Sequence, residues 1–108
     1  MAVQYLEHKG FRILQTNWRF KRAEVDIIAQ IDDLIVFVEV KTRSSDYFGP
    51  PDAFVTTRKQ KLVTTASHAY IEKLEYEGAI RFDIIAILIN DQASPQISHY
   101  EDAFFMGL

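Results

Sequence analysis

The stretch Ala23–Arg43, AEVDIIAQIDDLIVFVEVKTR, decides the fold that we predict. Two runs rich in β-branched and aromatic residues, Glu24–Ile31 and Leu34–Thr42, lie on either side of Asp32 and Asp33. Two such runs around a two-residue turn indicate a β-hairpin, although Asp-Asp is a weaker turn signal than Asn-Gly. We therefore expect two antiparallel strands joined by a tight turn.

The turn also sets the expected register of the hairpin. With Asp32–Asp33 at its tip, Asp26 faces Glu39 and Glu24 faces Lys41. Directly opposed residues project from the same face, with Cβ atoms about 4.5–5.5 Å apart. The opposite face then takes only apolar residues, namely Val25, Ile27, Ala29, Val36, Val38 and Val40. One face of the hairpin is thus core, and the other carries three carboxylates and an amine.

Outward from the hairpin, the patterns predict the order α-β-β-β-α-β with a possible extra β. Before the hairpin we expect a helix over residues 1–9, ended by Gly10, and a strand Phe11–Asn17. After it we expect a loop Ser44–Asp52 and a helix that begins at a T-x-x-Q capping box (Thr57–Gln60) and stops at Gly78. The chain then continues with a strand Ile80–Asn90, a weaker strand Gln96–Tyr100 and an apolar tail Ala103–Met106. The nearly all-apolar strand Ile80–Asn90 is typical of one covered on both faces, with Asp83 inside it paired to Arg81 or Arg12. We expect an α/β fold, a mixed sheet flanked by helices, in one domain over residues 1–108.

The composition is that of a soluble globular protein, with 48% hydrophobic and 25% charged residues. The formal charge of −3 is uneven: residues 1–61 hold ten Lys/Arg and eight Asp/Glu (+2), and residues 62–108 hold two and seven (−5). Because phosphate binding responds to the local field, the hairpin half remains compatible with nucleic acid. The lack of cysteine excludes thiolate metal sites and cysteine nucleophiles. No signal-like leader or membrane-length apolar run appears, so we expect a cytoplasmic protein that does not contact membranes.

The facing carboxylates of Asp26 and Glu39 need a physical reason. At roughly 4 Å and an effective dielectric near 20, two like charges repel by about 4 kcal/mol. A shared proton, a cation such as Lys41 or a bound divalent metal would relieve this repulsion. A few oxygen ligands suit Mg²⁺ or Mn²⁺, which can activate water against a phosphodiester. From spacing alone, this metal site and a purely structural polar cluster are equally open.

The segments AEVDIIA (Ala23–Ala29) and FVEVKTR (Phe37–Arg43) resemble the D…E-x-K core of the PD-(D/E)xK nucleases. The wider pattern is similar to the YraN-like family of bacterial proteins, within the same restriction-endonuclease-like and Holliday junction resolvase-like superfamily. That similarity spans essentially the whole chain and is carried by Tyr5–Arg19, the hairpin, Arg58–Lys61, Arg81–Ala86 and Asp102–Phe104. It implies a restriction-endonuclease-like core.

The resemblance also implies roles for individual residues. Asp26 and Glu39 would hold Mg²⁺ or Mn²⁺ together with the backbone carbonyl of Val40, and Lys41 would be the catalytic lysine. Related enzymes add a glutamate from the first helix, a place that Glu7 could take. The acid Glu24 is a further accessory candidate.

Several basic and polar residues are candidates for contact with nucleic acid. Asn17 and Arg19 match the family's N-x-R, and Arg43 continues the Glu39–Lys41 face. Positive charge in the first turns of a helix opposes the macrodipole by some tenths of a kcal/mol, and phosphate contact would explain its presence at Arg58, Lys59 and Lys61. The alternative for each is a solvated side chain. Gln60, in the same turns, is more typical of a helix cap than of a ligand.

Two functions of different classes follow. The first is a metal-dependent endonuclease that acts on structured DNA in repair or recombination. The second is a nuclease-derived domain that binds nucleic acid or a protein partner without cutting. The acidic second half and Ala23, where the family pattern usually has Gly, favour this second function. A small scaffold with a structural polar hairpin is a third reading, and a homodimer is open in each case.

Overall fold

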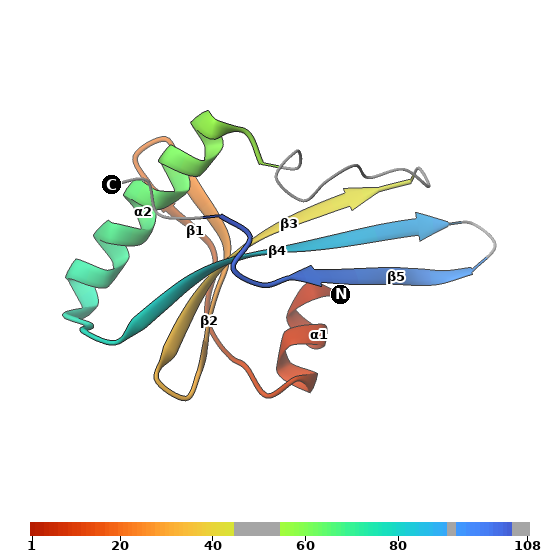
Figure 1. Ribbon diagram of the computed structural model, residues 1–108, viewed down its shortest axis with the longest axis horizontal. Coiled ribbons are helices and arrows are strands. Elements are labelled where there is room, and N and C mark those ends of the chain that lie inside the picture. Colours follow the sequence, from red (N-terminus) through yellow and green to blue (C-terminus); the bar gives the residue numbers. More distant parts are fainter. Residues whose placement is uncertain (45–54, 91–92, 105–108) are drawn as a thin grey trace.

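A computed structural model describes residues 1–44, 55–90 and 93–104 as one five-stranded sheet with two helices (Figure 1). The strands lie side by side in chain order, with β3 and β4 parallel and the other neighbours antiparallel. In chain order the elements are α1 (Ala2–His8), β1 (Arg12–Phe20), β2 (Ala23–Ile31), β3 (Leu34–Arg43), α2 (Thr57–Leu74), β4 (Ala79–Asn90) and β5 (Ala93–Tyr100). The predicted α/β class, mixed sheet and element order are confirmed, and the extra strand is present as β5.

The central hairpin forms as its sequence predicts. Ile31 pairs with Leu34 across the two-residue turn, and the predicted register holds up to the pair of Ile27 with Val38. Asp32 has a φ of +52°, a left-handed conformation that aspartate tolerates better than most residues and that tight hairpin turns require. The turn chemistry therefore sets the register of β2 against β3.

Strand β1 is longer than predicted, because it continues from Asn17 to Phe20. Asn17 has a φ of +50° inside the strand, and asparagine accepts this conformation without ending the pairing. A second two-residue turn follows, in which Phe20 pairs with Ala23 and Lys21 takes a φ of +57°. The polar Asn17 marks an irregular point of β1 and not its end.

Two apolar clusters lie on opposite faces of the sheet. Alternate residues of β2, β3 and β4 pack either under α2, with Tyr70, or under α1, with Leu6. Val25 is an exception to the predicted alternation: it belongs to the α2 cluster, whereas Ile27 belongs to the α1 cluster. The alternation of β2 thus breaks at Asp26, and the polar face that we expected on the hairpin is covered by α2.

The ends of α2 differ from the sequence-based expectation. Its N-cap is Thr56, whose side chain accepts a hydrogen bond from the Lys59 N–H at 3.2 Å, so the predicted capping box that starts at Thr57 is wrong. At the other end, Glu75 supplies the left-handed C-cap (φ +55°) that we expected from Gly78. A side chain at Gly78 would collide with the Tyr76 ring, so close packing is the reason for this glycine.

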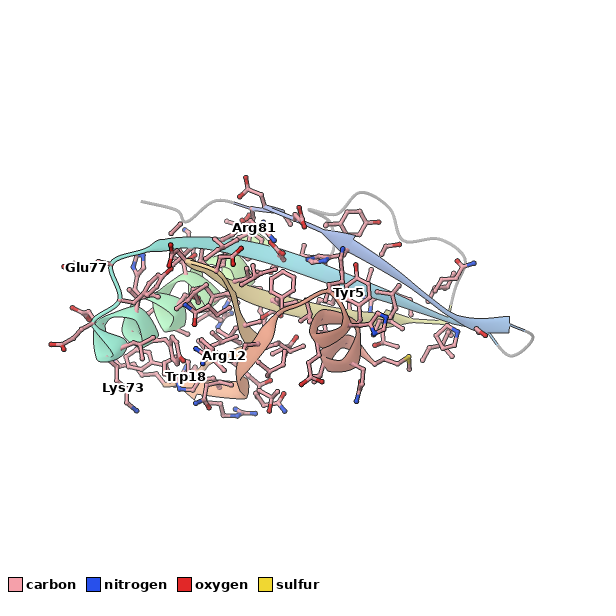
Figure 2. All side chains as sticks on the ribbon, turned by 90° about the horizontal axis from the view of Figure 1, so that it is seen from below. Tyr5, Arg12, Trp18, Lys73, Glu77 and Arg81 are labelled. Atoms are coloured by element: carbon pink, nitrogen blue, oxygen red, sulfur yellow. The ribbon has the colours of Figure 1, made fainter. Side chains whose placement is uncertain are left out.

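Asp83, on β4, is fully buried and joins β4, β5, the turn after β5 and, through His99, α1. It accepts two hydrogen bonds from Arg81 at 2.8 Å and one from the Asp102 N–H at 3.0 Å. His99 Nε2 lies 2.7 Å from its Oδ2, and His99 Nδ1 is within 3.4 Å of the Tyr5 hydroxyl on α1. Tyr5 and Arg81, labelled in Figure 2, mark the two ends of this Asp83 network. The predicted pairing with Arg81 is confirmed.

Most of the predicted loop Ser44–Asp52 and of the apolar tail Ala103–Met106 lies outside the described residues. Strand β5 begins at Ala93, three residues before the predicted Gln96. Within the described part of the chain, neither helix has the length and apolarity needed to cross a lipid bilayer.

Candidate functional site

The candidate site lies where β2 separates from β3. The regular pairs of the hairpin end at Ile27 and Val38, one residue before Asp26 and Glu39. Beyond that point β3 runs on beside β4, while β2 turns away toward α2 (Figure 1). The Asp26 carboxylate then accepts the Val40 N–H at 2.8 Å, in place of a backbone partner. Asp26 therefore lies where the two strands separate, and the predicted direct pairing of Asp26 with Glu39 across the hairpin is wrong.

Glu39 is almost wholly buried at this divergence, with 2% of its surface exposed. Lys59 of α2 places its Nζ 3.7 Å from Glu39 Oε2, whereas Oε1 has no hydrogen-bond partner among the described residues. Burial first, and repulsion from Asp26 second, raise the pKa of Glu39 to about 7, against the attraction of Lys59 and Lys41. Glu39 is thus an acid whose charge is only partly compensated.

Asp26 lines an open pocket of about 500 Å³ on the α1 side of the sheet. The other lining residues are Met1, Ala2, Val3, Thr16, Asn17, Ile27 and Val40. Because Thr16 pairs with Ile27 and Trp18 with Val25, Asn17 stands opposite Asp26. The pocket gives one carboxylate of the pair access to solvent and brings the predicted Asn17 beside it.

The residues present fit a divalent cation. The site combines a buried, unpartnered carboxylate oxygen on Glu39 with the neighbouring carboxylate of Asp26. A cation is the partner that such an orphaned, charged atom lacks, and oxygen ligands suit Mg²⁺ or Mn²⁺. Among the described residues, no group of three Asp, Glu or His side chains is arranged to hold a metal ion, so two carboxylates would leave most ligand positions to water or phosphate.

The accessory acids do not join this pair. Glu24 of β2 forms an ion pair with Arg19 of β1, with 3.2 Å between Oε2 and Nε. The predicted opposition of Glu24 and Lys41 is therefore wrong. The reason is that β2 departs from β3 before Glu24, whereas the prediction extended the hairpin pairing along both strands. Glu7 is exposed on α1 and forms no three-acid cluster with Asp26 and Glu39 in the described chain.

The other candidate residues fall into two groups. Lys41 is half-buried and, with Lys59, acts electrostatically on Glu39. The remaining ones lie at the surface: Arg43 donates to its neighbour's carbonyl at Thr42, and Gln60 donates to the Val55 carbonyl at 3.0 Å. Arg58 and Lys61 are exposed, and among the described residues neither forms an ion pair with Asp26 or Glu39. Gln60 therefore acts as a local cap, as its sequence position suggested.

The contact of Lys59 with Glu39 was not expected from the sequence. From the sequence we left open a phosphate contact or a solvated side chain for Lys59, because a positive charge at a helix N-terminus is locally unfavourable. The structure gives a second explanation, in which the helix N-terminus points its lysine at a buried carboxylate. The available signal was the buried position of Glu39 inside an apolar strand, which requires a nearby cation.

The fold and site together define a class: an α/β protein with a five-stranded mixed sheet and an acidic pair, flanked by two lysines, where adjacent strands diverge. The chain belongs to the family described as "Uncharacterised protein family UPF0102", whose model matches residues 1–87. This family is the YraN-like family that the sequence motifs indicated, and the expected membership is confirmed.

Relatives of the chain carry the same family name. A UPF0102 protein of Flavobacterium psychrophilum is 46% identical, over 97% of this chain and 87% of the relative. A UPF0102 protein of Geotalea uraniireducens is 45% identical over 96% and 83%, and one of Alkaliphilus oremlandii is 43% identical over 96% and 91%. These names state no activity, and so function rests on the chemistry of the site.

Proposed function

We propose that this protein is a divalent-metal-dependent endonuclease that acts on nucleic acid, with structured DNA as the preferred substrate. The observation that supports it is the buried Glu39 beside Asp26, with one oxygen left without a partner. A structural acid in this position would be expected to have its oxygens satisfied, as buried polar atoms usually are. A carboxylate left uncompensated in the core is instead typical of a ligand-binding site.

Asp26 and Glu39 would hold Mg²⁺ or Mn²⁺, with the Val40 carbonyl as a third ligand suggested by the family resemblance. When bound, such an ion polarises a phosphodiester and lowers the pKa of coordinated water. The hydrogen bond from the Val40 N–H orients the Asp26 carboxylate in advance. This preorganisation would limit the reorganisation needed when a charged ligand enters.

Lys41 is suited to the developing charge of the reaction. It lies two residues along β3 from Glu39, on the same face of the strand, and is only half-buried. An ammonium in this position can donate to a phosphate oxygen or to the attacking water, and it stabilises the extra negative charge of the transition state. We assign it the role of catalytic lysine within this proposal.

The substrate class follows from the distribution of charge around the site. The half of the chain that holds Asp26 and Glu39 carries a net +2, against −5 for the rest. Exposed basic residues in this half of the chain, Arg19, Arg43, Arg58 and Lys61, would contact the phosphate backbone. A repair or recombination role in the cytoplasm, on branched or damaged DNA, belongs to the same proposal.

The test measures metal binding before activity. Mn²⁺ at about a hundred times its dissociation constant should stabilise the protein by about 2.7 kcal/mol. Asp26→Asn and Glu39→Gln should abolish the shift in melting temperature, while Glu24→Gln, which changes an acid paired with Arg19, should keep it. Cleavage of branched DNA should require the metal, Glu39 and Lys41. An unchanged melting temperature of the unmodified protein in Mn²⁺ would contradict the proposal.

The second candidate is a domain that binds nucleic acid without cutting it. The observation in its favour is that only two acids meet in the described chain, since Glu7 and Glu24 both lie elsewhere. This function predicts DNA binding that falls as salt rises, with no metal-dependent cleavage. A Mn²⁺-induced stabilisation without cleavage of linear, branched or nicked DNA would select it over the endonuclease.

A further inference from the structure

A groove separate from the acidic site lies between the β1–β2 turn and α2. It has a volume of about 280 Å³ and is lined by Phe20, Lys21, Arg22, Ala23, Leu62 and Thr65. The turn and the helix lie beside each other in Figure 1, at the upper left. This size is close to the lower end of the roughly 300–1,000 Å³ range of small-ligand pockets, and so it suits a single planar group.

The floor of this groove is aromatic and apolar. Phe20 is half-buried and lies parallel to Trp18, with an interplanar angle of 5° and a centroid separation of 6.3 Å. Trp18 in turn packs edge-on against Tyr70 of α2. The Phe20 ring is therefore held in a fixed orientation by its neighbours. Such a preorganised ring is a suitable surface for stacking a base.

The rim of the groove is basic. Lys21 and Arg22 are exposed on the turn, and the Lys21 Nζ lies 5.4 Å from the centroid of the Phe20 ring. On α2, Arg58 shares one face with Leu62 and Thr65, at helical spacing, and Lys61 lies next to it. Of the residues that the structure describes, no acidic one lines the groove. The positive rim is complementary to a phosphate backbone and not to a neutral ligand.

The groove is connected to the acidic site through the first turn of α2. Arg58, on the rim side, directly precedes Lys59, which contacts Glu39. A chain of phosphates that reaches the acidic pair could thus continue along this turn toward Phe20. A paired base would be hidden inside its duplex, whereas an unpaired base can stack on an aromatic ring.

We propose that this groove binds an unpaired segment of nucleic acid, with one base on Phe20 and the adjoining phosphates on Lys21, Arg22 and Arg58. The inference rests on the proposed nuclease function and specifies its substrate: nucleic acid with a single-stranded segment next to the scissile bond. The groove would select forks, flaps or junctions over plain duplex, because only these present a base that can leave its stack.

The turn offers a variant that removes charge without damage to the fold. Lys21 has a left-handed φ of +57°, which asparagine adopts more readily than lysine. Lys21→Asn should therefore preserve or improve the turn while it removes one cation. Phe20→Leu keeps an apolar side chain of similar bulk and removes the stacking surface. Lys73→Gln, in the last turn of α2, is the charge-matched control outside the groove.

The experiment measures binding by fluorescence anisotropy in EDTA, with labelled single-stranded oligothymidine, oligouridine and a blunt duplex of equal length. Phe20→Leu should weaken single-strand binding by at least about five-fold and leave duplex binding within about two-fold. Lys21→Asn should reduce the salt dependence of single-strand binding by about one ion, unlike Lys73→Gln. The two single strands separate a DNA substrate from an RNA substrate.

The outcomes separate this inference from the proposed cleavage. Asp26→Asn should bind the single strand like the unmodified protein, because it leaves the groove intact. Absence of metal-dependent cleavage by the unmodified protein, with Phe20-dependent binding intact, would overturn the nuclease function and keep the groove. The groove proposal would be overturned if Phe20→Leu lost affinity equally for duplex and single strand. It would also be overturned if Phe20→Leu, with an unchanged melting temperature, lost no affinity for the single strand. Preference of the unmodified protein for an acidic peptide over oligothymidine would also overturn it.

Discussion

Two buried carboxylates on adjacent strands of one sheet have opposite environments. Asp83, on β4, is fully buried and receives hydrogen bonds from Arg81, His99 and the Asp102 backbone. Burial alone would raise the pKa of Asp83, but these hydrogen bonds outweigh it and lower that pKa below the ordinary value. Glu39, on β3, has an ion pair with Lys59 at 3.7 Å, the weaker attraction of Lys41 and an acidic neighbour in Asp26, and its pKa rises to about 7.

The comparison distinguishes a buried carboxylate whose charge is compensated by hydrogen bonds from one whose charge is not. A carboxylate that is fully hydrogen-bonded stabilises the state in which it is charged, and it holds together the elements that supply its donors. A carboxylate whose charge is left partly uncompensated destabilises the fold at neutral pH. Such a cost is common at binding sites, where the missing partner is the ligand. Asp83 thus organises the fold, whereas the uncompensated carboxylate of Glu39 is the group to which we assign metal binding in the proposed function.

The largest expected effect is the loss of stability on removal of the Asp83 carboxylate. Asp83→Ala leaves the Arg81 guanidinium and the His99 ring without their shared partner, and we expect a loss of about 3–5 kcal/mol in the free energy of unfolding. Chemical denaturation at neutral pH measures it. Asp83→Asn, which keeps the shape of the side chain, should recover only part of the loss. Wild-type stability in Asp83→Ala would remove the contrast between the two acids.

For a substitution of Glu39 we expect a change in the free energy of unfolding of the opposite sign. Glu39→Gln removes a charge that the metal-free protein compensates poorly, and so it should stabilise that protein by up to roughly 3 kcal/mol at pH 8, from the rise of the pKa from 4.5 to about 7. Denaturation in EDTA measures the gain. A destabilised Glu39→Gln would show that Glu39 is structural, like Asp83.

The two acids should also give stability profiles of opposite slope with pH. Glu39 binds its proton more tightly in the folded than in the unfolded state, so its favourable contribution is complete below pH 4.5 and is lost as pH rises to about 7. Asp83 has a lowered folded pKa, so its contribution is complete above the unfolded value of 3.8 and is lost as pH falls through its folded pKa. The free energy of unfolding, measured between pH 3 and 8 in EDTA, should fall between pH 4.5 and about 7 in the unmodified protein. This fall should be absent in Glu39→Gln. A slope that persists in this variant would contradict the assignment.

The smallest effect concerns the Lys59–Glu39 ion pair. With a separation of 3.7 Å and a Lys59 side chain that is 35% exposed, the pair should contribute about 0.2–1 kcal/mol. A double-mutant cycle of Lys59→Met and Glu39→Gln isolates this coupling in the free energy of unfolding. The analogous cycle with Lys61→Met is the control, since no ion pair to Glu39 is found for Lys61 within the described chain. A coupling equal to that of the control would show that Lys59 does not compensate Glu39.

Much of the fold could be predicted because its signals are local. The Asp32–Asp33 turn, the register from Ile27 to Ile31 and the end of α1 at Gly10 depend on a few adjacent residues and on their backbone preferences. Family membership, which the motifs indicated, is likewise a property of the chain alone. The start of α2 was misplaced because Thr56 and Thr57 both suit an N-cap, and in the structure it is the Thr56 side chain that accepts the Lys59 N–H.

The sequence by itself determined the element order, the tight hairpin and the presence of one acid on each of its strands. The tertiary structure alone decided the surroundings of these acids, because β2 separates from β3 at Asp26 and α2 brings Lys59 to Glu39 from twenty residues along the chain. It also paired Glu24 with Arg19 in an ion pair and placed Val25 in the α2 cluster. Local patterns encode which face a residue prefers, but burial and electrostatic compensation depend on groups that only packing brings together.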